Sequence, residues 1–398
     1  MRKLNIGLFN DSFPPTIDGV AQTVKNYATV LQRNHCNVTV VTPEYKGVED
    51  RYPFDVFRYQ SVPLDRRIGY RAGNPFNPDT LLKLRSKRFD LMHVHAPFAS
   101  SVLVSNLNHR PKVPVVLTYH TKFDIDIAKR VALHGFRKIA MRFLLENINA
   151  ADEVWVVTEG CAQSLRDVGY RGNYMVMENG TDFRYGRAAP EQVEALKDKY
   201  GIKEDEFVFL FVGRMMWYKN VRLILDTLKI LRSKGVPYRA LMVGDGYDAP
   251  AIREYAAQQG LADCVTFTGP VYDREYLRVF YSLADMFLFP STYDTSGIVV
   301  KEAAACDCPT LLIRNSCAAE GAVHDVSGFL AEERAADCAA VMLDACQSRE
   351  HLSQVGKNAG KDLYLSWDTA VARAYARYEE ILNQWPGPLP YNSKHRRY

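Results

Sequence analysis

The chain reads Ser291-Thr-Tyr-Asp-Thr-Ser-Gly-Ile-Val-Val-Lys-Glu302 at a point where a strand is expected to give way to a helix. The residues before it, 286–290, form a short apolar run that ends at a proline, which is typical of a buried strand. From Gly297 onward the spacing of apolar residues predicts a helix. The first N–H groups of that helix lack partners and carry the positive end of its dipole, so the turn suits a phosphate-bearing ligand.

Two acids flank this turn, Asp294 before it and Glu302 inside the helix. The pair resembles the signature of GT-B glycosyltransferase family 4, in which two glutamates are separated by seven residues. The resemblance implies that Glu302 binds the nucleotide ribose, that Asp294 orients a sugar hydroxyl, and that Gly297 and Ile298 line the nucleotide site. Asp294 is one methylene shorter than the family's glutamate. The alternative is a pair of solvated acids beside an ordinary turn.

A second segment, Phe207-Val-Phe-Leu-Phe-Val-Gly-Arg214, is an apolar strand that ends in Gly-Arg, and Lys219 follows five residues later. It resembles the family's diphosphate-binding segment. A guanidinium can bond two phosphate oxygens at once and an ammonium adds a point charge, so Arg214 and Lys219 could neutralise a departing diphosphate. Further on, Gly244 opens a Gly-Asp-Gly turn that resembles the family's loop near the nucleotide. A solvated basic loop and a plain turn are the alternatives.

The N-terminal part carries two more such positions. Gly19 follows Asp18 where a loop opens a helix, and it resembles the glycine loop that lies under the diphosphate in the family. The alternative is a helix start with an aspartate cap. His120 ends an apolar strand that begins at Val113, and it resembles the histidine that family members place beside the donor sugar. Ligands collect at the carboxyl ends of strands in open α/β sheets, although a lone histidine can equally be structural.

Apolar strand patterns and helical patterns alternate along the chain, which predicts parallel α/β sheets. In the first half we expect strands near 4–9, 37–42, 90–95, 113–119, 153–158 and 174–178, and helices near 20–32, 98–108, 128–149 and 160–168. After the turn at Glu178–Asp182, a second series has strands from 207 and near 238–243, 265–268, 286–290 and 309–313.

The order of the five segments resembles the GT-B fold, with two Rossmann-like domains facing a central cleft. The implied domains are an acceptor-binding domain at 1–180 and a nucleotide-sugar-binding domain at 181–364. The amphipathic stretch near 365–384 resembles the terminal helix that crosses back to the first domain.

Composition agrees with a globular chain long enough for two domains, since 398 residues are 47% hydrophobic and 24% charged. The chain lacks an apolar run of about eighteen residues and a signal-peptide pattern at its start, so we expect a cytoplasmic protein. The eight cysteines are expected to be reduced and mostly buried. Basic residues are dispersed among acids, which argues against nucleic-acid binding.

An Asp-x-Asp motif at Asp124 and Asp126 is of the kind that holds a divalent cation in other glycosyltransferases. It lies in the domain that is not expected to hold the nucleotide, so we predict no metal site there and roles at a helix start or in the acceptor pocket. The expected enzyme requires no cofactor beyond its nucleotide-sugar substrate. Magnesium would be non-essential.

The acceptor is suggested by a basic amphipathic stretch between Lys122 and Arg142, which includes Lys129, Arg130 and Arg137. Such a face can lie on an anionic bilayer, and Leu81–Arg88 adds positive charge. The outer helix of any α/β domain also has one charged side. The turn at Asp294–Gly297 resembles the Glu-Thr-Gln-Gly variant of bacterial glucosyltransferases that act on diacylglycerol.

The resemblance implies a retaining hexosyltransferase that moves glucose from UDP-glucose to a membrane lipid such as diacylglycerol, peripherally on the inner face of the cell membrane. Three alternatives stay open. They are transfer to a soluble or polysaccharide acceptor, epimerisation of the nucleotide sugar, and binding without catalysis.

Overall fold

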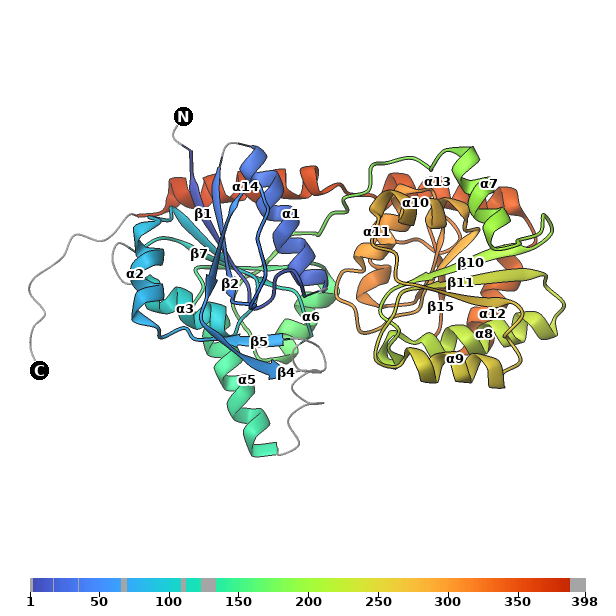
Figure 1. The fold of residues 1–398 in the computed structure, drawn as a ribbon, viewed down its shortest axis with the longest axis horizontal. Coiled ribbons are helices and arrows are strands. Elements are labelled where there is room, and N and C mark those ends of the chain that lie inside the picture. The colour runs from blue at the N-terminus through green and yellow to red at the C-terminus, as the bar shows by residue number, and fades with distance from the viewer. Residues whose placement is uncertain are drawn as a thin grey trace, which may run out of the picture. The chain divides into compact units, whose positions relative to one another are not determined.

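The computed structural model describes residues 3–16, 18–34, 36–65, 70–108, 112–122 and 134–386. The chain forms two compact units, each a parallel sheet covered by helices (Figure 1). Unit 1 comprises the chain up to Glu178 together with the helix that begins at Trp367, and unit 2 comprises Asn179–Ser366. The chain therefore leaves unit 1 once and returns to it at its end.

Unit 1 is built on a parallel seven-stranded sheet in the order β3-β2-β1-β6-β7-β8-β9. Its strands are β1 (Asn5–Phe9), β2 (Asn37–Pro43), β3 (Asp55–Tyr59), β6 (Leu91–Val94), β7 (Val115–Tyr119), β8 (Glu153–Val156) and β9 (Met175–Val176). The last residue of β1, Phe9, lies opposite Val41 of β2 and Val94 of β6, so neighbouring strands end side by side. An antiparallel pair, β4 (Ser61–Asp65) and β5 (Tyr70–Gly73), follows β3.

In the described residues of unit 1 the helices are α1 (Gly19–Arg33), α2 (Pro78–Ser86), α3 (Ala99–Leu107), α5 (His134–Asn149), α6 (Glu159–Asp167) and α14 (Trp367–Gln384). The helix α1 begins where the Asp18 carboxylate accepts a hydrogen bond from the Ala21 N–H at 2.7 Å. The terminal helix α14 packs beside α1, where the rings of Trp367 and Tyr27 lie 5.8 Å apart. The prediction that the chain's end crosses back to the first domain is confirmed.

Unit 2 has a six-stranded sheet in the order β12-β11-β10-β13-β14-β15. Its strands are β10 (Phe207–Val212), β11 (Tyr238–Val243), β12 (Val265–Gly269), β13 (Met286–Phe289), β14 (Thr310–Ile313) and β15 (Phe329–Ala331). Its helices are α7 (Pro190–Lys199), η1 (Trp217–Lys219), α8 (Val221–Ser233), α9 (Ala249–Gln258), α10 (Arg274–Leu283), α11 (Ile298–Ala305), η2 (Cys317–Ala319), α12 (Ala335–Ala345) and α13 (Arg349–Asp362).

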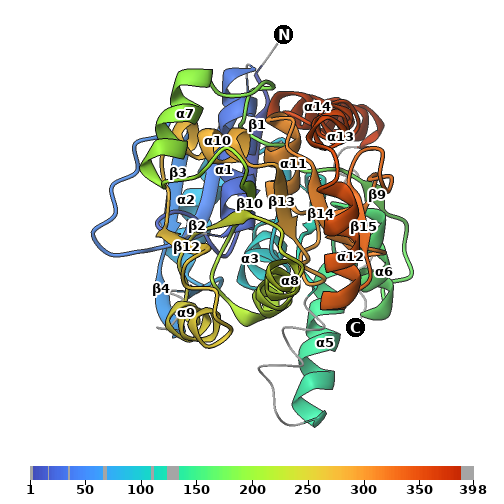
Figure 2. The ribbon, with the colours of Figure 1, turned by 90° about the vertical axis from the view of Figure 1, so that its right-hand side faces the viewer.

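Both faces of the unit 2 sheet are buried, and strand β10 shows how its sequence achieves this. Alternate side chains of a strand point to opposite faces. Phe209 and Phe211 accordingly pack in one core with α8, α9 and α12, while Leu210 packs in the other with α7, α10 and α11 (Figure 2). A continuous apolar run is therefore what this central parallel strand requires.

Most of the predicted strands are confirmed, including all five of the second series. The strand expected at 174–178 is only two residues long, and α5 begins at His134 in the part of the chain that the structure describes, within the helix expected at 128–149. Four strands were not predicted, namely β3, β4, β5 and β15. The first three lie in residues 50–75, which mix prolines, glycines and arginines without a clear period, and β15 is only three residues long. Six of the eight cysteines are buried, as predicted, and none is joined in a disulfide in the described residues.

Candidate active site

Three neighbouring strands of unit 2 end along one edge of the sheet, and the loops that follow them carry most of the predicted site residues. The loop after β10 carries Arg214 and Lys219, the loop after β11 carries Gly244, and the loop after β13 carries Asp294 and leads to α11. From β10 the chain continues through β11 and β12 on one side of that strand, and it then returns to form β13 on the other side. The direction in which strands are added therefore reverses between β10 and β13. In open α/β sheets, the crevice at such a reversal is where ligands bind.

Lys219 and Asp294 meet at this crevice, because the Lys219 ammonium donates to the Asp294 carboxylate. Both side chains are mostly buried, with 13% and 23% of their surface exposed. The amide of Asn220 ties the two loops together by donating to the Pro290 carbonyl at 2.8 Å. The second carboxylate oxygen of Asp294 is buried and lacks a hydrogen-bond partner among the described residues. The pair thus keeps unused bonding capacity.

Arg214 is exposed on the same loop as Lys219, and the backbone around it is fixed by the turn that begins at Gly244. Gly244 has φ +133°, and a Cβ atom there would lie 2.0 Å from the Gly213 carbonyl oxygen. The Met215 N–H donates to the Asp245 carbonyl at 3.0 Å. Only glycine permits the backbone to approach this closely. Gly244 is therefore required because the loop after β11 packs against the loop after β10.

Gly297 and Ile298 form the start of α11, as predicted. Gly297 adopts the left-handed conformation, with φ 54° and ψ 56°, and its carbonyl accepts from the Val300 N–H at 2.8 Å. A Cβ atom at Gly297 would lie 3.1 Å from atoms of Ala318 and Val300. The short helix therefore starts abruptly beside Asp294, with its first N–H groups at this edge of the sheet.

Glu302 lies inside α11 and is 5% exposed, so it is not a solvated acid. Its two oxygens accept from Arg274 at 2.6 Å and from the Tyr281 hydroxyl at 2.9 Å. Arg274 also donates to both carboxylate oxygens of Asp182, at 3.0 and 2.5 Å, and its guanidinium lies 4.4 Å from the centre of the Phe183 ring. Burial and the neighbouring Glu302 raise the pKa of Tyr281 well above its ordinary value, so Tyr281 remains a donor.

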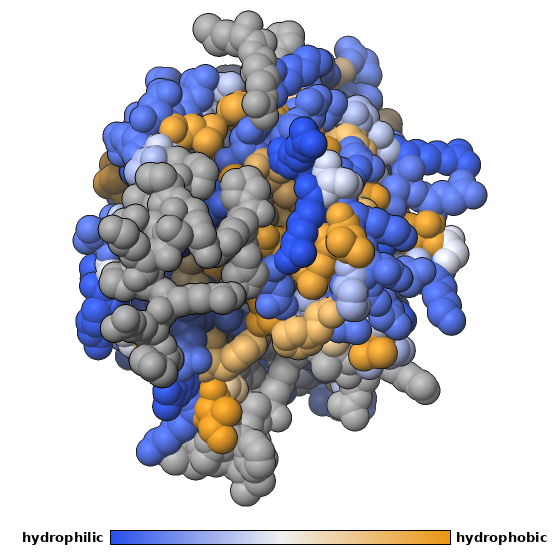
Figure 3. Space-filling model, turned by 90° about the vertical axis from the view of Figure 1, so that its left-hand side faces the viewer, coloured by the Kyte–Doolittle hydropathy of each residue, from blue (hydrophilic) through white to orange (hydrophobic). Residues whose placement is uncertain are grey.

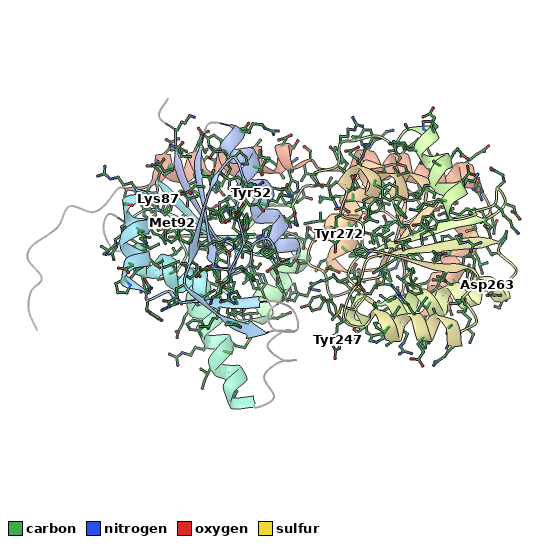
Figure 4. All side chains as sticks on the ribbon, in the orientation of Figure 1. Tyr52, Lys87, Met92, Tyr247, Asp263 and Tyr272 are labelled. Carbon is green, nitrogen blue, oxygen red and sulfur yellow. The ribbon has the colours of Figure 1, made fainter. Side chains whose placement is uncertain are left out.

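The sequence did not reveal this group of Asp182, Arg274 and Tyr281 around Glu302. Asp182 stands in the turn that precedes the second series of strands, and Arg274 and Tyr281 lie on α10 without a motif of their own. The sequence analysis also did not single out Tyr247 and Tyr272, which are exposed on the loops after β11 and β12 (Figure 4). A buried acid such as Glu302 needs a cation from a neighbouring element. That requirement is the one sequence-based reason to expect an arginine near α11.

In unit 1, His120 follows β7 and is buried, and its Nε2 lies 2.9 Å from Nδ1 of His95. Burial lowers the pKa of His120 to about 3, so the imidazole is neutral. Gly19 is the first residue of α1 and is exposed, with open space where a Cβ atom would lie. Both stand at the carboxyl edge of the unit 1 sheet. The contact with His95 was not predicted.

Asp11 is a second unpredicted residue at the unit 1 edge. One of its carboxylate oxygens accepts from the N–H and the hydroxyl of Ser100, both at 2.8 Å, at the start of α3. Burial raises the pKa of Asp11 to about 6. It is an acid with half of its bonding capacity in use.

Several predicted positions lie outside the described residues, namely Asp124, Asp126, Lys129 and Arg130, and the side chain of Arg137 is likewise not described. Among the described residues, no group of three or more histidine, cysteine, aspartate or glutamate side chains could hold a metal ion. The helices in the described ranges include none long and apolar enough to cross a membrane.

Solved structures share this architecture. The chain matches HepE of Anabaena, solved with UDP, with a TM-score of 0.77 at 18% identity over 95% of this chain and 100% of that one. It matches sucrose-phosphate synthase from Thermosynechococcus elongatus with a TM-score of 0.78 at 19% identity over 96% and 100%. The fold is therefore GT-B, as predicted.

Two family models match the chain, Glycosyltransferase Family 4 at residues 17–185 and Glycosyl transferases group 1 at residues 192–362. Together they cover most of both units, and the chain belongs to this family of glycosyltransferases. It is an enzyme that transfers hexosyl groups.

Among curated relatives, the chain is 25% identical to the alpha-monoglucosyldiacylglycerol synthase of Acholeplasma laidlawii over 89% of this chain and 92% of that protein. It is 26% identical to the synthase of the same name from Streptococcus pneumoniae over 77% and 70%. The predicted resemblance to diacylglycerol glucosyltransferases is confirmed.

Proposed function

We propose that the enzyme transfers glucose from UDP-glucose, with retention of configuration, to the free hydroxyl of diacylglycerol at an anionic membrane surface. The observation that carries the transfer is the meeting of Lys219 and Asp294 at the crevice between β10 and β13, with Arg214 on the same loop. The acceptor and the sugar rest on the names of two relatives that match over most of their lengths. Retention rests on the family resemblance.

In the proposed reaction, the bond between the anomeric carbon and the diphosphate oxygen breaks, and a bond to the acceptor oxygen forms. The acceptor's proton leaves with the diphosphate. Charge develops on the diphosphate, where Arg214 and Lys219 stabilise it more strongly than in the ground state. Lys219 exchanges part of its bond to Asp294 for the phosphate, and Asp294 then accepts from a sugar hydroxyl.

The buried Glu302 is proposed to accept hydrogen bonds from the ribose. A carboxylate oxygen can accept more than one hydrogen bond, so the bonds from Arg274 and Tyr281 leave capacity on both oxygens. These two donors also fix the orientation of the acid before the nucleotide arrives. Preorganisation of this kind reduces the ordering cost of binding.

The proposed membrane contact uses unit 1. The helix α5 extends beyond the end of the unit 1 sheet (Figure 1) and exposes Ile139 and Phe143, with 66% and 44% of their surface accessible. Lys138 and Arg142 are exposed on the same helix. An apolar side chain between cations is what an anionic bilayer surface binds. Hydrophobic residues also lie in small groups between hydrophilic ones on the face of unit 1 shown in Figure 3.

Donor and acceptor can be tested in turn. We expect UDP-glucose to raise the melting temperature more than GDP- or ADP-glucose, because a ligand that binds only the native state stabilises it. Incubation with UDP-glucose and diacylglycerol in anionic vesicles should then yield an α-linked glucolipid, identified by the anomeric proton coupling. A product from soluble glycans alone would refute the lipid acceptor, and conversion of the donor without acceptor would indicate an epimerase.

Membrane binding needs a separate measurement. Reversing the charges of Lys138 and Arg142 to glutamate should abolish co-sedimentation with anionic vesicles, because each cation contributes about 1 kcal/mol at such a surface. The matched control reverses Lys357 and Lys361 on α13 of unit 2, both of which are exposed. Equal loss in both variants, or no vesicle binding by the unmodified enzyme, would contradict the assigned surface.

A further inference from the structure

Three histidines form a buried row behind the edge of the unit 1 sheet. His93 lies in β6, His95 follows that strand, and His120 follows β7, with exposed fractions of 0%, 1% and 6%. The ring centres of His93 and His95 are 4.0 Å apart, and those of His95 and His120 are 5.2 Å apart with planes inclined by only 20°. A row of three buried imidazoles ending at a predicted site residue requires a physical reason.

The first histidine of the row is fully bonded. Nδ1 of His93 pairs with the Tyr378 hydroxyl at 2.5 Å, and its Nε2 pairs with the Thr118 hydroxyl at 2.6 Å. Tyr378 belongs to α14, and its ring stacks on Trp155 at 5.4 Å with planes inclined by 11°. His93 is thus fixed from both sides and forms a rigid surface against which His95 packs.

The second histidine is bonded through one nitrogen only. Nδ1 of His95 lies 2.9 Å from Nε2 of His120, whereas Nε2 of His95 is buried without a hydrogen-bond partner in the described part of the chain. Burial lowers the pKa of both rings, so each carries a single proton. In the hydrogen bond between them, one nitrogen must donate and the other must accept.

The unpartnered nitrogen decides which one donates. If His120 donated from Nε2, the proton of His95 would sit on its buried and unpartnered Nε2. Orphaned buried N–H groups are rarer than under-used acceptors. The arrangement that avoids this places the His95 proton on Nδ1, which donates to Nε2 of His120, and it leaves the proton of His120 on Nδ1.

We propose that His95 is a positioning residue that holds His120 in the Nδ1–H tautomer, so that His120 meets the sugar as a hydrogen-bond donor and not as a base. The inference rests on the proposed function for its substrate. Because Nε2 of His120 is occupied by His95 and Nδ1 carries the proton, His120 has no nitrogen left to take a proton from the acceptor hydroxyl. This agrees with the proposed reaction, in which the acceptor's proton leaves with the diphosphate.

The tautomers can be measured directly in the full-length enzyme without any substrate. Nine histidines are few enough to assign by single substitutions in a long-range ¹⁵N–¹H spectrum. At pH 7.5 we expect His120 and His95 each to show a protonated Nδ1 and a bare Nε2. A protonated Nε2 on His120 would overturn the inference, whatever the enzyme's activity.

Two substitutions separate positioning from mere packing. His95→Leu removes the donor while keeping an apolar side chain, and we expect the Nε2–H form of His120 to appear and turnover to fall about tenfold, with little change in KM for the donor. His95→Asn keeps a donor near the position of Nδ1 and should restore the tautomer and most of the rate. Equal losses in the two variants, with an unchanged His120 spectrum, would show that His95 only fills space.

The control is His351→Leu on α13 of unit 2, where the side chain is 42% exposed, and this change should alter neither the His120 signal nor turnover. If the His95 variants do not fold, the spectrum of the unmodified enzyme decides the question by itself. If the Nδ1–H tautomer is found but no glucosyl transfer to lipid occurs, the proposed function fails while the role of His95 stands.

Discussion

The carboxyl edges of the two sheets differ in the kind of polar contact that they hold. The edge of unit 2 is charged, with Lys219 paired to Asp294 and Arg274 placed between Glu302 and Asp182. The edge of unit 1 carries the acid Asp11, but it is dominated by neutral imidazoles joined to one another and to hydroxyl groups. Under the proposed function, unit 2 stabilises the charge of the nucleotide and unit 1 orients neutral hydroxyl groups.

Removing a cation from the charged edge should have the largest effect. We expect Lys219→Ala and Arg214→Ala each to raise the barrier for transfer by about 3 kcal/mol, the usual loss for a single transition-state donor. The measurement is kcat/KM with UDP-glucose, and Lys234→Ala at the end of α8 is the matched control. Near-normal rates in both variants would remove the role assigned to this edge.

The buried acid of the charged edge gives the second test. Arg274→Ala leaves Glu302 in α11 without its cation, and we expect a loss of about 2 kcal/mol in the free energy of unfolding together with weaker UDP binding. Urea denaturation and calorimetry measure the two effects. The exposed Arg253 on α9 serves as the control. An unchanged UDP affinity in the Glu302→Ala variant would show that Glu302 does not bind the nucleotide.

Lowering the pH should reduce the free energy of unfolding through the three buried histidines of unit 1. His93, His95 and His120 have folded pKa values below the ordinary 6.5, so below that pH the unfolded chain binds more protons and stability falls. Each histidine contributes about 1.4 kcal/mol per pH unit. The raised pKa of Asp11, about 6, acts in the opposite direction but offsets only one of the three.

We therefore expect the free energy of unfolding of the enzyme to be lower at pH 5.5 than at pH 7.5. His95→Leu should reduce the slope of stability against pH by about one proton. Denaturant titrations at the two pH values measure both quantities. A stability that does not change over this interval would mean that the three rings are not held neutral.

The smallest effect is expected for Asp294→Glu, which restores the acid typical of the family. The Lys219 ammonium is carried on a flexible stem and can follow the longer side chain, so we expect turnover within about threefold of the unmodified enzyme, or about 0.7 kcal/mol. Asp294→Asn removes the charge and is the comparison. Complete loss in Asp294→Glu would show that the local geometry requires aspartate.

Strands were the most predictable part of the fold, because buried parallel strands such as β10 and β13 are continuous apolar runs. The pair β4 and β5 was missed because it lies beside the sheet and lacks that pattern. The terminal helix was anticipated from its amphipathic spacing and from the family resemblance. Local sequence thus predicted most strands of the two sheets, but it missed the partly buried β3 and the three-residue β15.

The candidate site was predictable where a motif holds its residues close together in sequence. Gly297 and Glu302 share one helix, and Arg214 and Lys219 share one loop. Contacts between segments distant in sequence were not predictable, and these include the contacts of Arg274 with Glu302 and of His95 with His120. They depend on which strands lie side by side, and no local pattern encodes that order.

The return of α14 to unit 1 has a consequence for how the chain is made. Unit 1 needs Tyr378 and Trp367 to close its interior over His93 and Tyr27, and these residues are synthesised after the whole of unit 2. Domains usually fold in order of synthesis, but here the half that emerges first from the ribosome is completed last. A chain halted before Trp367 would leave aromatic and imidazole rings of that half uncovered and open to aggregation.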